Sequence, residues 1–218
     1  MRTRVKICGI TRPEWALAAA DAGADAIGLV FAESVRRVTP FEAARIVTAL
    51  PPWVAAVGVF VDEPPVRIGT IAHSAGLAAI QLHGDEMPET PAKLAPLKVI
   101  KAFRIGSPAD IEAARRWRAS AEQARRLPDA YLIDAAAPDG AKGGTGLVAD
   151  WRLAARMVGE GFWPLILAGG LGPENVAEAI AAVRPWGVDT SSGVESAPGV
   201  KDPEKMRAFV EEVRKASD

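Results

Sequence analysis

The sequence has few of the features that join a chain covalently or carry it into a membrane. Its 218 residues include one cysteine, Cys8, so an intramolecular disulfide is impossible. The N-terminal residues do not form the apolar segment that is typical of a signal peptide, and no apolar run is long enough to span a bilayer. We therefore expect a cytoplasmic protein with no membrane partner.

Excess charge and metal-binding side chains are also scarce. The net charge is −1, so the electrostatic basis for a nucleic-acid partner is missing. Two histidines, His73 and His83, together with one cysteine do not make a zinc set. No nucleophile-elbow pattern surrounds a serine, which argues against a Ser-His-Asp hydrolase. The glycine-rich run Gly143-Gly144-Thr145-Gly146 is neither a Walker loop nor a full dinucleotide fingerprint.

What the sequence does contain is a regular alternation of strands and helices. We expect strands over residues 5–8, 26–31, 54–61, 78–82, 99–103, 131–134, 164–168 and 187–190. Helices are expected over 13–21 (capped by Thr11), 40–50 (capped by Thr39), 64–75, 88–94, 108–126, 149–158, from 173 onward, and 204–215. Such alternation favours a parallel sheet, and these units predict an α/β fold with a single (β/α)8 TIM barrel domain over residues 1–218. The alternative is an open doubly wound sheet, which requires that some of the short segments predicted as strands are not strands.

The last two predicted strands each lead into a short glycine-rich turn, here called a glycine corner. Strand 164–168 leads into Gly169-Gly170-Leu171-Gly172, and strand 187–190 leads into Ser191-Ser192-Gly193. Glycine lets backbone N–H groups approach an anion, and a following helix N-terminus adds partial positive charge. One corner is explained by a tight turn alone. Two neighbouring corners late in an α/β chain predict the phosphate site of a barrel.

Side-chain alternation predicts which strand residues face the barrel interior. If apolar Val5 and Ile7 face the helices, Lys6 and Cys8 point inward. By the same rule Gln81, His83 and Asp189 point inward, while Asp134 ends its strand and Lys101 lies in the strand before it. Because barrel enzymes keep their chemistry at the carboxyl ends of the strands, this gathering favours a site.

Each of these polar residues also has a structural interpretation. Cys8 is compatible with an inert buried thiol, and His83 with a hydrogen-bonded structural histidine. Lys6 and Lys101 are expected to act mainly as charge partners for Asp134 and Asp189. Residue types alone therefore leave both interpretations open.

Short motifs follow one another in order along nearly the whole chain. They are Lys6-Ile7-Cys8-Gly9-Ile10-Thr11, Gly23-Ala24-Asp25-Ala26-Ile27-Gly28, Val57-Gly58-Val59-Phe60-Val61, Gln81-Leu82-His83-Gly84, Lys101-Ala102-Phe103-Arg104, Gly143-Gly144-Thr145-Gly146, Leu167-Ala168-Gly169-Gly170-Leu171, Gly187-Val188-Asp189 and Ser191-Ser192-Gly193-Val194-Glu195. Each motif is weak by itself, whereas the ordered set is highly specific. Through this set the chain resembles the phosphoribosylanthranilate isomerase family of tryptophan biosynthesis, whose fold is a (β/α)8 barrel.

The resemblance implies an Amadori rearrangement that converts N-(5-phosphoribosyl)anthranilate to the 1-deoxyribulose aminoketose without a cofactor or metal. Cys8 matches the general base of the family and Asp134 its general acid. Arg36 matches the arginine that holds the anthranilate carboxylate, and Asp189 an aspartate that contacts the ribose. The residues that match the phosphate site are Gly169, Gly170, Ser191, Ser192 and Gly193. The expected partner is a small sugar phosphate, and the expected state is a monomer or homodimer.

The implied chemistry suits these residue types. A protonated Asp134 opens the sugar ring by giving a proton to the ring oxygen, and the Cys8 thiolate then removes the C2′ proton of the iminium. Lys6 is expected to help hold Cys8 ionised. The chain departs from the family at Ser34-Val35-Arg36, where the usual pattern is Ser-Pro-Arg, and loss of the proline should loosen the loop that carries Arg36.

Two other functions compete with this interpretation. A sugar-phosphate isomerase of histidine synthesis shares the phosphate clamp and a similar rearrangement, but such barrels typically have an aspartate where this chain has Cys8. A phosphate-ligand binding barrel without catalysis would keep the glycine corners and have no need of Cys8 and Asp134. Assays with both sugar-phosphate substrates distinguish these possibilities.

Overall fold

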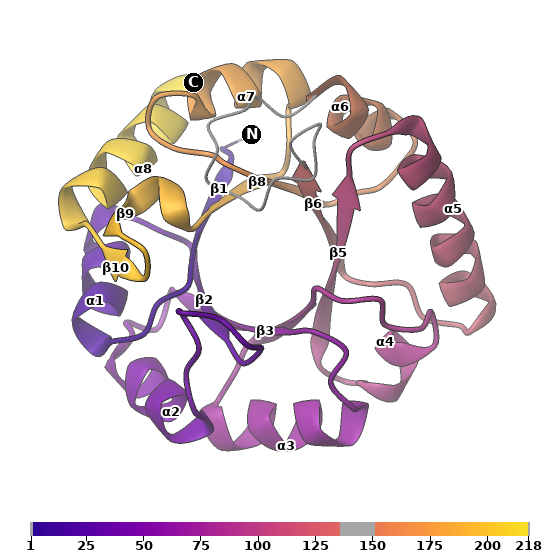
Figure 1. The fold of residues 1–218 in the computed structure, drawn as a ribbon, viewed down its shortest axis with the longest axis horizontal. Coiled ribbons are helices and arrows are strands. Elements are labelled where there is room, and N and C mark those ends of the chain that lie inside the picture. The colour runs from indigo at the N-terminus through magenta and orange to yellow at the C-terminus, as the bar shows by residue number, and fades with distance from the viewer. Residues whose placement is uncertain (1, 136–150, 218) are drawn as a thin grey trace.

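The protein is a ring of strands surrounded by helices, as Figure 1 shows for a computed structural model that describes residues 2–135 and 151–217. The strands pair in parallel in chain order, and the last pairs with the first, so the barrel is closed. They are β1 (Arg4–Cys8), β2 (Ala26–Val30), β3 (Ala55–Phe60), β4 (Ala79–Leu82), β5 (Lys98–Ile105), β6 (Ala130–Ala135), β7 (Leu165–Ala168) and β8 (Gly187–Thr190). The predicted (β/α)8 barrel is confirmed, and the open-sheet alternative is wrong.

Helices follow the strands and cover the outside of the ring (Figure 1). They are α1 (Pro13–Ala22), α2 (Pro40–Ala49), α3 (Pro65–Ala75), α4 (Thr90–Lys93), α5 (Pro108–Gln123), α6 (Trp151–Gly159), α7 (Val176–Val183) and α8 (Pro203–Ser217). Thr39 caps α2 as predicted, in a reciprocal capping box with Glu42. The predicted cap of α1 is wrong, because Arg12 rather than Thr11 occupies the N-cap position.

The chain after β8 contains elements that the sequence analysis did not anticipate. A short 3-10 helix, η1 (Ser192–Val194), is followed by an antiparallel hairpin of β9 (Glu195–Ala197) and β10 (Val200–Lys201). The dipeptide Pro198-Gly199, a common turn signal, joins the two strands, and Gly199 has a left-handed φ of 79°. The hairpin lies at the rim of the barrel, beside α8 in Figure 1.

Strand alternation divides the core into two layers. Val5 and Ile7 belong to the large cluster between the strands and the helices. A smaller cluster of strand residues, including Ile100 and Leu132, fills the barrel interior. Among the described helices, none is both long and apolar enough to cross a bilayer.

Lys101 does not face the barrel interior, and its predicted pairing with Asp134 or Asp189 is wrong. It lies between Ile100 and Ala102 of the inner layer and therefore points outward. Its ammonium donates to the buried Glu86 carboxylate at 2.7 Å and to the Gly84 carbonyl at 2.6 Å. β5 also continues to Ile105, so Lys101 is in mid-strand rather than near the strand end.

The glycine-rich run Gly143-Gly144-Thr145-Gly146 lies outside the described residues, as does the predicted start of the helix at 149. From Trp151 onward this helix is present as α6.

Candidate active site

A cavity of about 290 Å³ lies at the carboxyl ends of the strands. The predicted site residues that line it are Cys8, Arg36, Asp134, Gly169, Gly170, Asp189, Ser191 and Ser192. Residues from β1, β6, β7 and β8 therefore meet around one space, although 181 positions separate Cys8 from Asp189 in the sequence. Gly193 is the one predicted site residue outside this lining.

Cys8 ends β1 and is partly buried. Burial raises the pKa of its thiol, and attraction to Lys6 offsets this only in part, while Asp189 adds to the increase. The expectation that Lys6 holds Cys8 ionised is therefore only half right. Lys6 favours the thiolate, but desolvation outweighs it, so the resting thiol is protonated at neutral pH.

Lys6 pairs with Asp189 across the β1–β8 boundary, as expected for one of the two lysines. Its Nζ donates to Asp189 Oδ2 at 2.9 Å, and the two side chains are only 5% and 8% exposed. Burial alone would lower the pKa of Lys6, but the combined attraction to and hydrogen bonding with Asp189 and Cys8 outweigh it and raise the pKa. The second carboxylate oxygen, Oδ1, is buried without a hydrogen-bond partner in the described part of the chain. A ligand hydroxyl in the cavity would satisfy it.

Asp134 lies near the end of β6, with His83 beside it. The distance from His83 Nε2 to Asp134 Oδ2 is 3.6 Å. On the other side of the imidazole ring, His83 Nδ1 lies 2.7 Å from the Gln81 amide nitrogen. That amide donates to Nδ1, which assigns the ring proton to Nε2, the nitrogen that faces Asp134. His83 thus adjoins a site carboxyl, a contact that its structural interpretation did not include.

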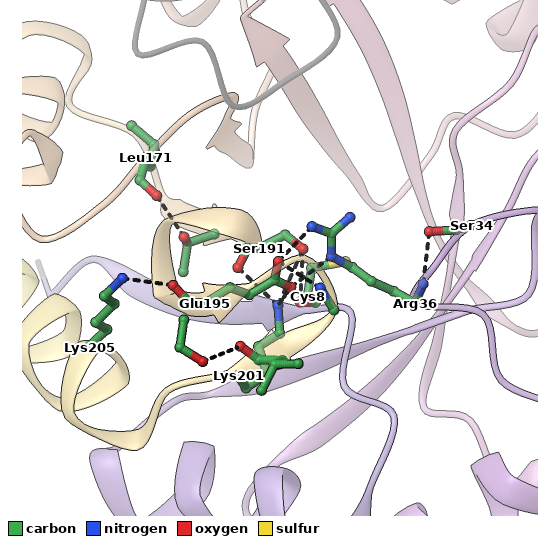
Figure 2. Close-up of polar contacts among 12 residues, drawn as sticks. Cys8, Ser34, Arg36, Leu171, Ser191, Glu195, Lys201 and Lys205 are labelled. Carbon is green, nitrogen blue, oxygen red and sulfur yellow. Dashed lines mark hydrogen bonds and ion pairs between the residues drawn. The ribbon is translucent and has the colours of Figure 1, made fainter.

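Arg36 is held by a glutamate that the sequence analysis did not single out (Figure 2). Its Nε and Nη2 donate to the two oxygens of Glu195, each at 2.7 Å. Lys201 donates to Glu195 Oε1 at 2.7 Å and to the Ser191 carbonyl at 2.9 Å. Burial would raise the pKa of Glu195, but the bonds from Arg36 and Lys201 outweigh it and lower the pKa to about 2. The turn signal Pro198-Gly199 could have predicted the hairpin that brings Glu195 and Lys201 together.

The first glycine corner depends on left-handed backbone. Gly169 and Gly170 have φ values of 98° and 63°, which only glycine adopts readily. The Asn175 side chain closes the corner by donating to the Gly170 carbonyl at 3.0 Å and accepting from Gly172 N at 2.9 Å. Because Asn175 is used in this turn, α7 begins at Val176 rather than at Pro173 as predicted.

The two corners pack directly on each other. A Cβ added to Gly193 would lie 2.0 Å from the Leu171 carbonyl oxygen, so only glycine allows this approach. Thr190 donates its hydroxyl to the same oxygen at 2.6 Å. Ser191 Oγ donates to the Cys8 carbonyl at 3.1 Å, which ties the second corner to the end of β1. Gly193 therefore supports the corners from behind rather than lining the cavity.

Comparisons with known proteins agree with this geometry. The family model for N-(5'phosphoribosyl)anthranilate (PRA) isomerase matches residues 5–212. The N-(5'-phosphoribosyl)anthranilate isomerase of Geobacter sulfurreducens is 48% identical over 208 residues, which cover 95% of this chain and 96% of the relative.

Solved structures show the same relationship. The phosphoribosyl anthranilate isomerase of Thermotoga maritima aligns with a TM-score of 0.88 at 42% identity, over 98% of this chain and 99% of that one. A phosphoribosyl anthranilate isomerase in complex with reduced 1-(o-carboxyphenylamino)-1-deoxyribulose 5-phosphate aligns with a TM-score of 0.84 at 40% identity, again over 98% and 99%. The chain belongs to the N-(5'-phosphoribosyl)anthranilate isomerase family.

Proposed function

We propose that Cys8 and Asp134 are the general base and the general acid with which this chain isomerises PRA to 1-(2-carboxyphenylamino)-1-deoxyribulose 5-phosphate in tryptophan biosynthesis. The observation that carries the proposal is the shared cavity. A thiol from the end of β1 and a carboxyl from the end of β6 line the same space as two glycine corners. An acid and a base around one anion-binding space are what the rearrangement of a sugar phosphate requires.

The proton transfers follow from this placement. Protonated Asp134 gives its proton to the ring oxygen, the C1′–O bond breaks, and the nitrogen lone pair forms the iminium. His83, with its Nε2–H toward Asp134, then donates to the carboxylate that remains. The thiolate form of Cys8, a minor species at neutral pH because burial raises the pKa of the thiol, removes the C2′ proton, and the electron pair moves toward nitrogen to give the enolamine. C1′ then takes the proton back from the Cys8 thiol while the C2′ hydroxyl gives its proton to the Asp134 carboxylate, which completes the ketone and restores both groups.

Binding groups surround this acid–base pair. Asp189 Oδ1, buried without a partner in the described chain, suits a ribose hydroxyl. The corners at Gly169, Gly170 and Ser192, supported from behind by Gly193, suit the phosphate dianion, to which the left-handed Gly169 and Gly170 present backbone N–H groups. Ser191 already donates its hydroxyl to the Cys8 carbonyl, so we assign it a backbone contact with the phosphate. Arg36 takes the anthranilate carboxylate.

The proposal is tested with Cys8→Ala and Asp134→Asn in a fluorescence assay that follows loss of the anthranilate adduct. Each change is expected to lower kcat by about 10²–10⁴-fold, because each removes one proton-transfer group. Competitive inhibition by inorganic phosphate should stay unchanged, since the glycine corners are intact. Near-normal turnover in either variant would remove that residue from its proposed role.

Arg36→Ala is expected mainly to raise KM, because the carboxylate of the substrate is present in both ground and transition states. An unchanged KM would contradict carboxylate binding at Arg36.

We also propose that residues 1–218 act as one catalytic domain in the cytoplasm, as a monomer or homodimer. Light scattering of the purified chain distinguishes the two states.

A further inference from the structure

Glu195 contacts only one edge of the Arg36 guanidinium. Its two oxygens accept from Nε and Nη2, a bidentate pairing along the side of the group (Figure 2). A guanidinium has five N–H donors in one plane, so both Nη1 donors and the second Nη2 donor remain. Within residues 2–135 and 151–217, no hydrogen bond uses Nη1. Because Arg36 lines the cavity, its end edge is available for a second bidentate carboxylate.

Glu195 is itself fixed by further donors. Lys201 Nζ donates to its Oε1 at 2.7 Å, and Gly199 N donates to its Oε2 at 3.1 Å. The Glu195 and Lys201 side chains are 4% and 0% exposed. With two bonds from Arg36 added, each carboxylate oxygen accepts two hydrogen bonds, so the Glu195 carboxylate has one available orientation.

The charge of this cluster favours an incoming anion. Lys201 Nζ lies within hydrogen-bond distance of three acceptors, namely Glu195 Oε1, the Ser191 carbonyl at 2.9 Å and Ser191 Oγ at 3.4 Å. Three acceptors require three N–H donors, which only the ammonium form provides. Arg36 and Lys201 together outweigh Glu195 by one positive charge. An aryl carboxylate at the free edge of Arg36 would neutralise that charge.

The hairpin also supports the loop that lacks the family proline. Gly199, at the hairpin turn, has φ 79°, and a Cβ there would lie 3.3 Å from the Val35 carbonyl oxygen. Arg36 N donates to Ser34 Oγ at 3.1 Å within the loop itself. The placement of Arg36 therefore depends on contacts with Glu195 and the hairpin, where the family pattern places a rigid Pro before the arginine.

We propose that Glu195 is a positioning residue that makes the site selective for arylamine substrates with an ortho carboxylate. It aligns the free edge of Arg36 with the cavity, and Lys201 holds Glu195 in place. The inference rests on the proposed function, since it assigns the substrate carboxylate to Arg36. It predicts that replacing Glu195 raises KM only for substrates that carry this carboxylate.

The test compares two substrates in Glu195→Gln. One is PRA, and the other is the corresponding phosphoribosyl derivative of aniline, made from aniline and ribose 5-phosphate, which lacks the carboxylate. The KM for PRA is expected to rise about 10- to 100-fold with kcat within about threefold, the scale of one charge-assisted hydrogen bond. The KM for the aniline derivative should change by less than about twofold, because it makes no bond to Arg36.

Controls separate positioning from folding. Glu212→Gln makes the same chemical change in α8, where Glu212 pairs with Lys215, and should leave both substrates unaffected. In an Arg36→Ala background, Glu195→Gln should cause no further rise in KM. If Glu195→Gln does not fold, Glu195→Asp replaces it. Its shorter side chain cannot hold both Arg36 and Lys201, and the same selective rise in KM is expected.

Arg36→Ala is measured first, because its outcome distinguishes two failures. An unchanged KM for PRA in Arg36→Ala would refute the carboxylate site of the proposed function, and the inference with it. A raised KM in Arg36→Ala, combined with an unchanged KM in Glu195→Gln, would refute the role of Glu195 alone. Equal losses for both substrates in Glu195→Gln would likewise refute it, since a general structural defect has no preference for the carboxylate.

Discussion

Because Gly28 has no side chain, it leaves the space that the Cys8 thiol occupies. The two residues are register partners in the β1–β2 ladder. A Cβ added to Gly28 would lie 2.5 Å from Cys8 Sγ and 3.0 Å from Cys8 Cα. Non-bonded heavy atoms are comfortable at about 3.5–4.0 Å, so Gly28→Ala forces an overlap of about 1 Å onto the sulfur. Because the Cys8 backbone belongs to the closed barrel, the thiol rather than the chain must move.

The expected loss is catalytic rather than structural. A displacement of about 1 Å at a reacting group lowers kcat by about 10²-fold, or about 2.7 kcal/mol in the activation barrier. Overpacking one methyl in the inner layer destabilises the fold by about 1–3 kcal/mol, which a barrel of this size tolerates. Gly28→Ala should therefore fold, bind phosphate normally and turn over slowly.

The measurement is the fluorescence assay for loss of the anthranilate adduct, together with the melting temperature of the variant. Gly69→Ala is a matched control, because no heavy atom lies within 4 Å of the added Cβ. Gly69 is inside α3, so the control should gain about 0.5–1 kcal/mol of stability and keep its kcat. A wild-type kcat in Gly28→Ala would refute either the placement of the thiol or its part in the reaction.

Two further predictions concern pH and a buried ion pair. Because burial raises the pKa of Cys8, the rate at which iodoacetamide alkylates this single cysteine should still be increasing at pH 9.0, the ordinary value for the thiol, as more enzyme carries the reactive thiolate. A pH profile that levels off near neutrality would contradict this. Lys101 and Glu86 form an ion pair outside the barrel, and Lys101→Met leaves the Glu86 carboxylate, which is 3% exposed, without its cation. The free energy of unfolding measured in urea should therefore fall by about 3–5 kcal/mol, while kcat of the folded enzyme stays unchanged. A loss below about 1 kcal/mol, typical of an exposed pair, would show that the carboxylate is not desolvated there.

Local pattern in the sequence was enough to predict the barrel and the inward direction of several site residues. Alternation along β1 places Lys6 and Cys8 on the inner face, and the structure pairs Lys6 with Asp189 there. The two glycine corners were visible because left-handed backbone and close approach require glycine at particular positions. These properties are local, since each depends on residues within a few positions of one another.

The same alternation does not tell the inside of a parallel barrel from its outside, because both faces of each strand are buried. For that reason Lys101 was grouped with the residues at the barrel mouth as a partner of Asp134 or Asp189, and neither its outward direction nor its partner Glu86 was foreseen. The raised pKa of Cys8 depends on how deeply its neighbours bury it, and burial is a property of the assembled fold. The contact of Arg36 with Glu195 joins side chains 159 positions apart. The sequence by itself determined which residues each strand presents. Only closure of the barrel decided which of them meet, since distances between strands are set by packing rather than by order along the chain.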